Sequence, residues 1–189
     1  MRGSTLSFGV LAITAALAAP SAHAAGEPAA PATCKGAEVP APQQSVAATR
    51  SAIVCLVDAA RAERRLSPLK ANARLQTAAQ RFARTLDPAK PLTHSGRDGS
   101  TPLTRIADAG YARDAAGISA AETLGRSKGS LATPATRVRK WLAAASTRKL
   151  LLSGKYRDVG VGVVITGTVA TFVVEVASPV AAGRSRSSR

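Results

Sequence analysis

Aromatic side chains are scarce in this sequence: Phe, Tyr and Trp make up only 3% of its 189 residues, with a single Trp. Proteins that bind single-stranded nucleic acid stack the bases on aromatic side chains. The sequence therefore predicts no specific nucleic-acid binding. The glycines of GVGVV (160–164) precede a turn and a second apolar run rather than a helix, so they do not predict a nucleotide-binding phosphate loop.

Long apolar runs are also missing, because nothing after residue 24 approaches the roughly 20 residues that a membrane span needs. The first 24 residues, MRGSTLSFGVLAITAALAAPSAHA, combine Arg2, a short apolar run and small residues ending in Ala22-His23-Ala24. This pattern is typical of a secretory signal peptide, 1–24. We predict a secreted protein, extracellular or periplasmic, without a transmembrane segment, whose mature chain of 165 residues (189 minus 24) forms one domain.

Acidic residues are few, with 11 Asp and Glu against 26 Lys and Arg, a net charge of +15. Removal of the signal peptide takes away Arg2 and leaves +14 (15 minus 1). A basic exported surface meets anionic cell-envelope polymers and lipid headgroups, and these are the partners that the charge predicts. The arginines are spread along the chain, however, so a compositional bias on solvated helix faces is the alternative interpretation. We expect a monomer.

Only two cysteines are present, Cys34 and Cys55. An even number in an exported chain favours a disulfide over free thiols or a zinc site. Closing this loop should stabilise the fold by roughly 3 kcal/mol in the chain-entropy model. The bond would attach the Pro/Ala-rich arm, 25–47, to the first helix.

Helical patterns fill the middle of the chain. The ordered domain is expected to begin near Ala48, with an apolar stripe that ends before Ser67-Pro68 and with Arg61 turned toward water. Asn72 is a predicted N-cap for a second helix that stops before Asp87-Pro88. Two further helices are predicted to open at Pro102 and at Thr133-Pro134.

Alternating apolar residues follow the helices. The runs 159–165 and 169–176 flank Thr166-Gly167-Thr168 and predict a β-hairpin, and a third strand is predicted near 118–124. Helices followed by strands predict an α+β fold. The basic end of the chain, 180–189, is predicted to be a disordered tail.

Several motifs resemble, in order, those of the CAP superfamily, which comprises cysteine-rich secretory, antigen five and pathogenesis-related proteins. They are CLVDAARAERRLSPLKANARLQTAAQRFA, THSGRDGSTPLTRIADAGY, AETLG and WLAAASTRKLLLSGKYRDVGVGVV. The match is to small bacterial secreted members and covers a domain at 48–179. The resemblance implies an α-β-α sandwich whose helices pack on a small, mainly antiparallel sheet.

The resemblance also implies a cleft that contains two histidines and two acidic or amide side chains. His94 matches the first histidine, Glu122 the glutamate and Glu175 the polar residue of the last strand, while Thr147 stands where the second histidine is expected. Zinc prefers three or four N, S or carboxylate ligands. Three alternatives follow: a metal site of His94, Glu122 and Glu175, a hydrogen bond by which His94 and Glu122 hold the loop, or a metal-free functional cleft.

Glu175 is unusual because it lies between two valines of a strand, where an unpaired buried carboxylate is costly. It is expected either to line a wet cleft or to pair with a cation, Arg148 or protonated His94. Nucleophilic catalysis has little support, since Ser95 is adjacent to His94 and neighbouring side chains rarely meet productively.

These observations favour a non-catalytic binding or structural module at the cell envelope or outside the cell, without a cofactor. The alternative is a hydrolase, divalent-metal-dependent or metal-free, that uses the cleft of His94 and Glu122.

Overall fold

The computed structural model describes residues 33–181. The predicted signal peptide, the first part of the arm and the tail from residue 182 on lie outside the described residues. Within the described range, no helix is both long and apolar enough to cross a membrane.

A four-stranded sheet forms the centre of the domain, in the order β1-β3-β4-β2. The strands are β1 (Lys70–Ala71), β2 (Gly117–Lys128), β3 (Asp158–Thr166) and β4 (Val169–Val180). Strands β3 and β4 form the predicted hairpin, β2 pairs with β4 along its whole length, and β1 is parallel to β3. The α+β class and the third strand are therefore confirmed, although β2 is longer than predicted.

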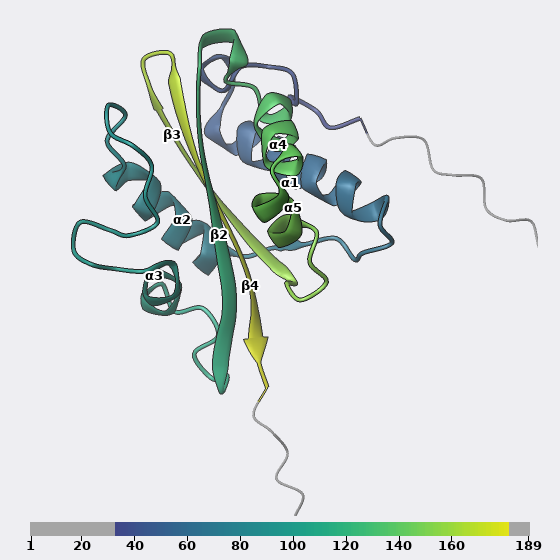
Figure 1. Ribbon diagram of the computed structural model, residues 1–189, viewed down its shortest axis with the longest axis vertical. Helices are drawn as coiled ribbons and strands as arrows, with labels where there is room; N and C mark the ends of the chain where they lie inside the picture. The colour runs from purple at the N-terminus through teal and green to yellow at the C-terminus, as the bar shows by residue number, and fades with distance from the viewer. Residues whose placement is uncertain (1–32, 182–189) are drawn as a thin grey trace, which may run out of the picture. The chain divides into compact units, whose positions relative to one another are not determined.

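Helices cover both faces of this sheet, as Figure 1 shows. One layer contains α1 (Val46–Ala62), α4 (Pro134–Ala143) and α5 (Ala145–Leu151), and the other contains α2 (Ala73–Thr85) and α3 (Pro102–Asp108). Two 3-10 turns complete the elements, η1 (Ala41–Gln43) and η2 (Gly129–Leu131). The α-β-α sandwich that the resemblance implied is confirmed.

Local sequence explains where the helices begin. The Asn72 side chain accepts the backbone N–H groups of Arg74 and Leu75, as an N-cap does, and Thr133 caps α4 in the same way. Thr101 and Thr104 form a reciprocal capping box at the start of α3. These caps satisfy amide groups that a helix cannot satisfy by itself, so the predicted start points are correct.

Two glycines allow α2 to approach the sheet closely. A Cβ atom at Gly160 would lie 2.1 Å from the carbonyl carbon of Leu75, and one at Gly162 would lie 2.2 Å from the carbonyl oxygen of Ala79. Because Gly160 and Gly162 alternate with valines in β3, the strand has no side chains at these two positions on the face toward α2. Beside it, the Gln80 side chain donates to the carbonyl oxygen of Val163 and accepts from the N–H group of the same residue.

The opposite face of the sheet packs against α1 and α4. The rings of Trp141 and Phe172 meet edge to face there, with centroids 6.5 Å apart. Valines of β3 and β4 complete this cluster, as do Ile53 and Val57 of α1. The larger apolar core therefore lies away from the polar cluster described below.

The arm is held more firmly than the sequence indicated. The Cys34–Cys55 disulfide is present, but Ala41 is also fully buried and its N–H group donates to the carbonyl oxygen of Ala132, 2.9 Å away. A single buried alanine makes no apolar pattern, so the sequence showed only the cysteine anchor. Helix α1 begins at Val46, two residues before the predicted start.

The environment of Arg61, in α1, differs from the prediction. It was expected to face water, yet only 2% of it is exposed. Its guanidinium group donates to the carbonyl oxygens of Ser67, Leu151, Ser153 and Tyr156. The arginine therefore ties α1 to the segment that follows α5, and burial lowers its pKa.

Candidate functional site

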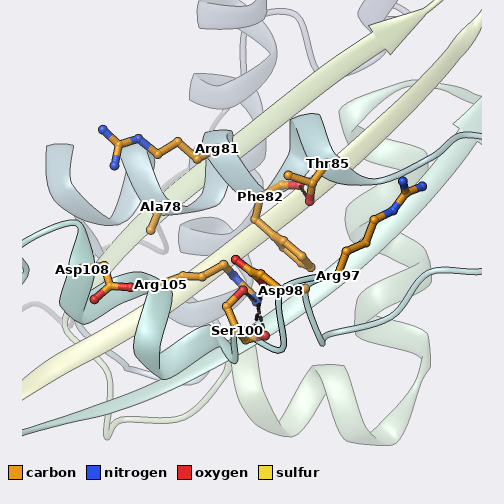
Figure 2. Close-up of a pocket in the computed structure, with 10 residues that line it drawn as sticks. Ala78, Arg81, Phe82, Thr85, Arg97, Asp98, Ser100, Arg105 and Asp108 are labelled. Carbon is orange, nitrogen blue, oxygen red and sulfur yellow. Dashed lines mark hydrogen bonds between the residues drawn. The ribbon is translucent and has the colours of Figure 1, made fainter.

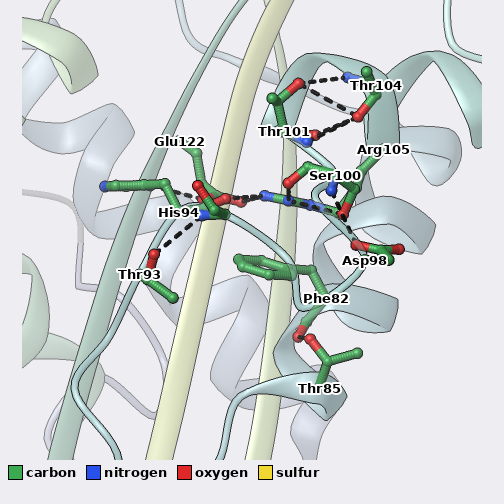
Figure 3. A network of polar contacts seen from close by, with 11 residues as sticks. Phe82, Thr85, Thr93, His94, Asp98, Ser100, Thr101, Thr104, Arg105 and Glu122 are labelled. Atoms are coloured by element: carbon green, nitrogen blue, oxygen red, sulfur yellow. Dashed lines mark hydrogen bonds and ion pairs between the residues drawn. The ribbon is translucent and has the colours of Figure 1, made fainter.

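A buried carboxylate on β2 organises the candidate site. The Glu122 side chain is fully buried, and its Oε2 atom accepts a hydrogen bond of 2.8 Å from Nη2 of Arg105. Its Oε1 atom lies 2.7 Å from Nδ1 of His94. One carboxylate thus joins α3 and the segment that precedes it to the sheet, as Figure 3 shows.

Arg105 is the centre of this arrangement. The guanidinium group lies 3.5 Å from the centroid of the Phe82 ring, a cation–π contact with α2. It also donates to the carbonyl oxygens of Ser100, at 3.0 Å, and His94, at 3.1 Å. We call residues 92–101 the histidine loop, and the contacts of Arg105 with Glu122, His94, Ser100 and Phe82 the arginine clamp. The clamp fixes both ends of the histidine loop against α2 and β2.

His94 occupies the outer side of the clamp. Its side chain is 58% exposed, whereas 10% of the Arg105 side chain is exposed. The imidazole therefore directs Nδ1 inward, to Glu122, while most of the ring faces solvent. The close contact of His94 with Glu122 is the geometry that the loop-holding alternative requires.

Glu175 lies on β4, directly across from Glu122 in the strand register. It is completely buried, and neither carboxylate oxygen has a hydrogen-bond partner within residues 33–181. Burial raises the pKa of Glu175 to about 8, with a further contribution from the charge of Glu122 and an opposing one from Arg105. Burial therefore favours the neutral, protonated form of this side chain.

The two environments that the sequence suggested for Glu175 are not observed. Arg148 donates instead to the carbonyl oxygens of Leu142 and Ala143, at the junction of α4 and α5. The complete burial of Glu175 also removes it from a wet cleft. The alternation of the strand predicted the face correctly, but the expected cation is missing: no ion pair joins Glu175 to another described residue.

Thr147 is not joined to the other three candidates. It lies on α5, and its hydroxyl group donates to the carbonyl oxygens of Trp141 and Ala144. No hydrogen bond between described residues links Thr147 to His94, Glu122 or Glu175. Its side chain closes the α4–α5 turn, a local role that any small hydroxyl residue can perform.

The donors that the resemblance assigns to zinc do not fit a metal ion. Both oxygens of Glu122 are already engaged, one by a guanidinium group and one by an imidazole nitrogen. Nowhere in residues 33–181 do three His, Cys, Asp or Glu side chains gather closely enough to hold a metal. No step of the proposed function is therefore assigned to a metal.

The letters G-x-S-x-G, which mark the nucleophile turn of some hydrolases, do occur at Gly125–Gly129. Such a nucleophile stands at a sharp turn between a strand and a helix. Here Ser127 lies inside β2, is buried and accepts a hydrogen bond from Arg137. It is therefore not an exposed nucleophile.

A pocket of about 390 Å³ lies between α2, the histidine loop and α3, and we call it the loop pocket. Figure 2 shows its lining, in which Phe82 and Ala78 provide apolar surface. Charged groups surround that surface: Arg81, Arg97, Arg105, Asp98 and Asp108. Hydrogen bonds from Ser100 lower the pKa of Asp98.

Arg105 and Phe82 are the site residues that sequence reasoning missed. Arg105 falls within the motif THSGRDGSTPLTRIADAGY and Phe82 within CLVDAARAERRLSPLKANARLQTAAQRFA, but no pattern singled out either residue. The spacing contained one signal: Arg105 lies in the last turn of α3, next to the buried Ile106, so its side chain begins near the core. Its pairing with Glu122 required knowledge of how α3 packs on β2.

Residues 54–176 match the family described as the cysteine-rich secretory protein family, CAP. No curated protein matches the chain in sequence.

Two solved structures are similar in fold. An outer surface protein from Borrelia burgdorferi is 21% identical, with a TM-score of 0.58 over 67% of this chain and 90% of that chain. An extracellular protein containing a SCP domain from Bacillus anthracis is 14% identical, with a TM-score of 0.52 over 69% of this chain. The match spans 43% of the Bacillus chain. Likeness at these identities concerns the fold.

Proposed function

The chain belongs to the cysteine-rich secretory protein (CAP) family, and on this basis we propose that it is a non-catalytic binding module that acts at the cell envelope or outside the cell. The disulfide supports an oxidising location, because such bonds persist outside the cytosol. The two similar structures support it too, since one is named an outer surface protein and the other an extracellular protein.

The observation that carries the proposal is the occupied carboxylate of Glu122. A general base needs an oxygen or nitrogen within hydrogen-bond reach of the proton that it removes. Both oxygens of Glu122 are bound within the arginine clamp, and the side chain has no exposed surface. The carboxylate thus serves the shape of the site.

The clamp supports binding because it builds the loop pocket. Arg105 joins the histidine loop to Phe82, and both of these groups form pocket walls. Ligand pockets are concave, largely apolar and supplied with a few polar groups. Apolar surface at Phe82 and Ala78 beside Arg81 and Arg97 suits an amphiphile with an anionic head, such as a fatty acid.

A metal-free hydrolase is the second candidate, and one observation favours it. Glu122 orients the imidazole of His94 through Nδ1 and leaves most of the ring exposed, as a carboxylate does in a catalytic triad. Arg105 opposes this interpretation, because its ion pair neutralises the charge that would stabilise a protonated imidazole. Binding is therefore placed first.

Calorimetric titration of the purified protein with dodecanoate, below its micelle concentration, tests the binding proposal. We expect one saturable site, which Arg97→Ala weakens by about threefold to tenfold because one charge-assisted contact is lost. Arg139→Ala is the matched control: both arginine side chains are largely exposed, 72% and 70%, and each has one distant carboxylate partner, at 3.7 and 3.9 Å. Equal effects of the two substitutions would refute a site in the loop pocket.

The catalytic alternative is tested with p-nitrophenyl esters. The binding proposal expects no turnover above that of buffer. Turnover that His94→Ala and Glu122→Gln both abolish would instead support the hydrolase and overturn the non-catalytic assignment.

A further inference from the structure

Three arginines surround a second, more polar hollow beside the outer border of β3, between α1 on one face of the sheet and α2 on the other. This arginine hollow has a volume of about 210 Å³. Arg50 reaches it from α1, and Arg81 and Arg84 reach it from α2. Its remaining lining consists of Gln76, Thr77 and Gln80, so no acidic residue is present in its wall.

The position of Arg50 is fixed by a chain of hydrogen bonds. Its Nη2 atom donates to Oε1 of Gln80. Gln80 is fixed in turn by the backbone of Val163, at 3.0 and 3.1 Å. The guanidinium group therefore stands at the hollow before any ligand binds, which reduces the entropy cost of binding.

Charge in the arginine hollow is not balanced by the protein. None of its three arginines has an ion pair with another described residue, and the Nε atom of Arg50 is buried without a hydrogen-bond partner there. Burial lowers the pKa of Arg50, and the charge of Arg84 lowers it further. Buried donors and repelling cations both favour an anion in this place.

The shape of the donor set distinguishes among anions. Each guanidinium group presents a planar fork of N–H donors. Three forks from two helices exceed what the two oxygens of a carboxylate can accept, whereas a phosphate group offers three or four oxygens and a larger charge.

We propose that the arginine hollow binds a phosphate group. The site is distinct from the loop pocket, although Arg81 lies in the lining of both. The phosphate group belongs either to a free inorganic ion or to a lipid headgroup, and these two sources present the same chemistry to the arginines.

The buried Nε–H group of Arg50 provides a local probe. The purified protein, labelled with ¹⁵N, is titrated with sodium phosphate at constant ionic strength, and the arginine Nε–H resonances are followed by NMR. We expect a saturable shift of the Arg50 resonance, and no such shift with sodium acetate. An equal response to acetate would overturn the proposal, because it would show general screening of charge.

Arg84→Ala and Arg74→Ala are matched variants on the same helix. Both arginines are exposed, and both substitutions remove one positive charge, but Arg74 lies outside the hollow. We expect Arg84→Ala to weaken phosphate binding about tenfold or more, and Arg74→Ala and Arg97→Ala to leave it unchanged. Equal losses for Arg84→Ala and Arg74→Ala would reduce the effect to net charge and overturn the site.

Vesicles identify the source of the phosphate. Phosphatidylcholine vesicles with and without phosphatidic acid are sedimented with each variant. Retention on phosphatidic acid that Arg84→Ala abolishes and Arg74→Ala preserves supports a lipid headgroup. A saturable phosphate shift without vesicle retention supports a free ion. Because Arg97 is outside this hollow, failure of dodecanoate binding leaves the phosphate result unaffected.

Discussion

Glu175 and Glu122 are cross-strand partners, and both are buried in the same layer between the sheet and α2. The two carboxyl groups are nevertheless in different states. Glu122 is bound by Arg105 and His94, whereas Glu175 has no hydrogen-bond partner among the described side chains and backbone groups. Two neighbouring carboxylates without enough positive charge cannot both ionise cheaply. The site therefore holds one carboxyl group that is paired and one that is buried without a partner.

The protonated Glu175 should make stability depend on pH. Burial raises its pKa from 4.5 to about 8, so between these values the unfolded chain has released a proton that the folded chain keeps. The contribution of Glu175 to the free energy of unfolding is then fully present below pH 4.5. It is lost as the pH rises from 4.5 through about 8, by a total on the order of 3 to 5 kcal/mol. Urea denaturation at several pH values measures this slope.

Glu175→Gln isolates the contribution of this carboxyl group. The free energy of unfolding of this variant should no longer fall as the pH rises from 4.5 to about 8. Above about pH 8 the variant should be more stable than the wild type. Glu63→Gln, at an exposed position, is the control and should keep the wild-type slope. Parallel curves for Glu175→Gln and the wild type would contradict a protonated Glu175.

Arg105→Met should destabilise the fold by about 3 to 5 kcal/mol, because it leaves the buried carboxylate of Glu122 without a cation. The long methionine side chain keeps apolar contact with Phe82. Adding Glu122→Gln should recover part of the loss, so a double-mutant cycle measured by urea denaturation should show a coupling of about 1 kcal/mol or more. Simple additivity of the two substitutions would argue against the clamp.

Zinc is expected to leave the His94 imidazole resonances unchanged at fixed pH, because the exposed Nε2 atom would be a lone ligand: among residues 33–181 no three His, Cys, Asp or Glu side chains gather closely enough to hold a metal. NMR of the purified protein, with His94→Ala to assign the signals, measures this. A His94 signal that shifts or broadens with zinc and recovers with a chelator would show that a metal displaces the clamp.

Gly160→Ala should destabilise the fold by about 3 kcal/mol or more, at or above the usual cost of overpacking, because the obstacle is the backbone of α2. The new Cβ atom would lie 2.1 Å from the carbonyl carbon of Leu75. Gly154→Ala is the control, since its nearest neighbour is a side-chain atom of Leu66 at 3.5 Å. Thermal unfolding of both variants provides the comparison, and equal midpoints would show that α2 is free to move away.

Features that depend on nearby residues could be predicted from the sequence. The N-caps Asn72 and Thr133, the hairpin about Gly167 and the apolar face of α2 all follow from local spacing or turn chemistry. The disulfide followed from the number of cysteines in an exported chain. Such features need no knowledge of how the layers pack.

Features that depend on distant partners could not be predicted. Arg61 looked solvent-facing because the helical pattern cannot show the carbonyl groups of Leu151 and Ser153, some ninety positions later, that accept its hydrogen bonds. In the site, the sequence motifs marked His94 and Glu122 but not the cation between them. Glu175 was placed on the correct face, while its protonated state follows from burial that only the packed structure reveals.

The hydrogen bonds between Gln80 and Val163 have a consequence for how copies of this protein meet. Strand β1 pairs with only Asp158 and Val159, so most of the outer border of β3 has no neighbouring strand among the described residues. An unpaired strand border is a template onto which a strand of another molecule can add. By occupying both the N–H and C=O groups of Val163, the glutamine side chain interrupts that template at its middle. We therefore expect this border of the valine-rich sheet to resist the addition of a strand from another molecule.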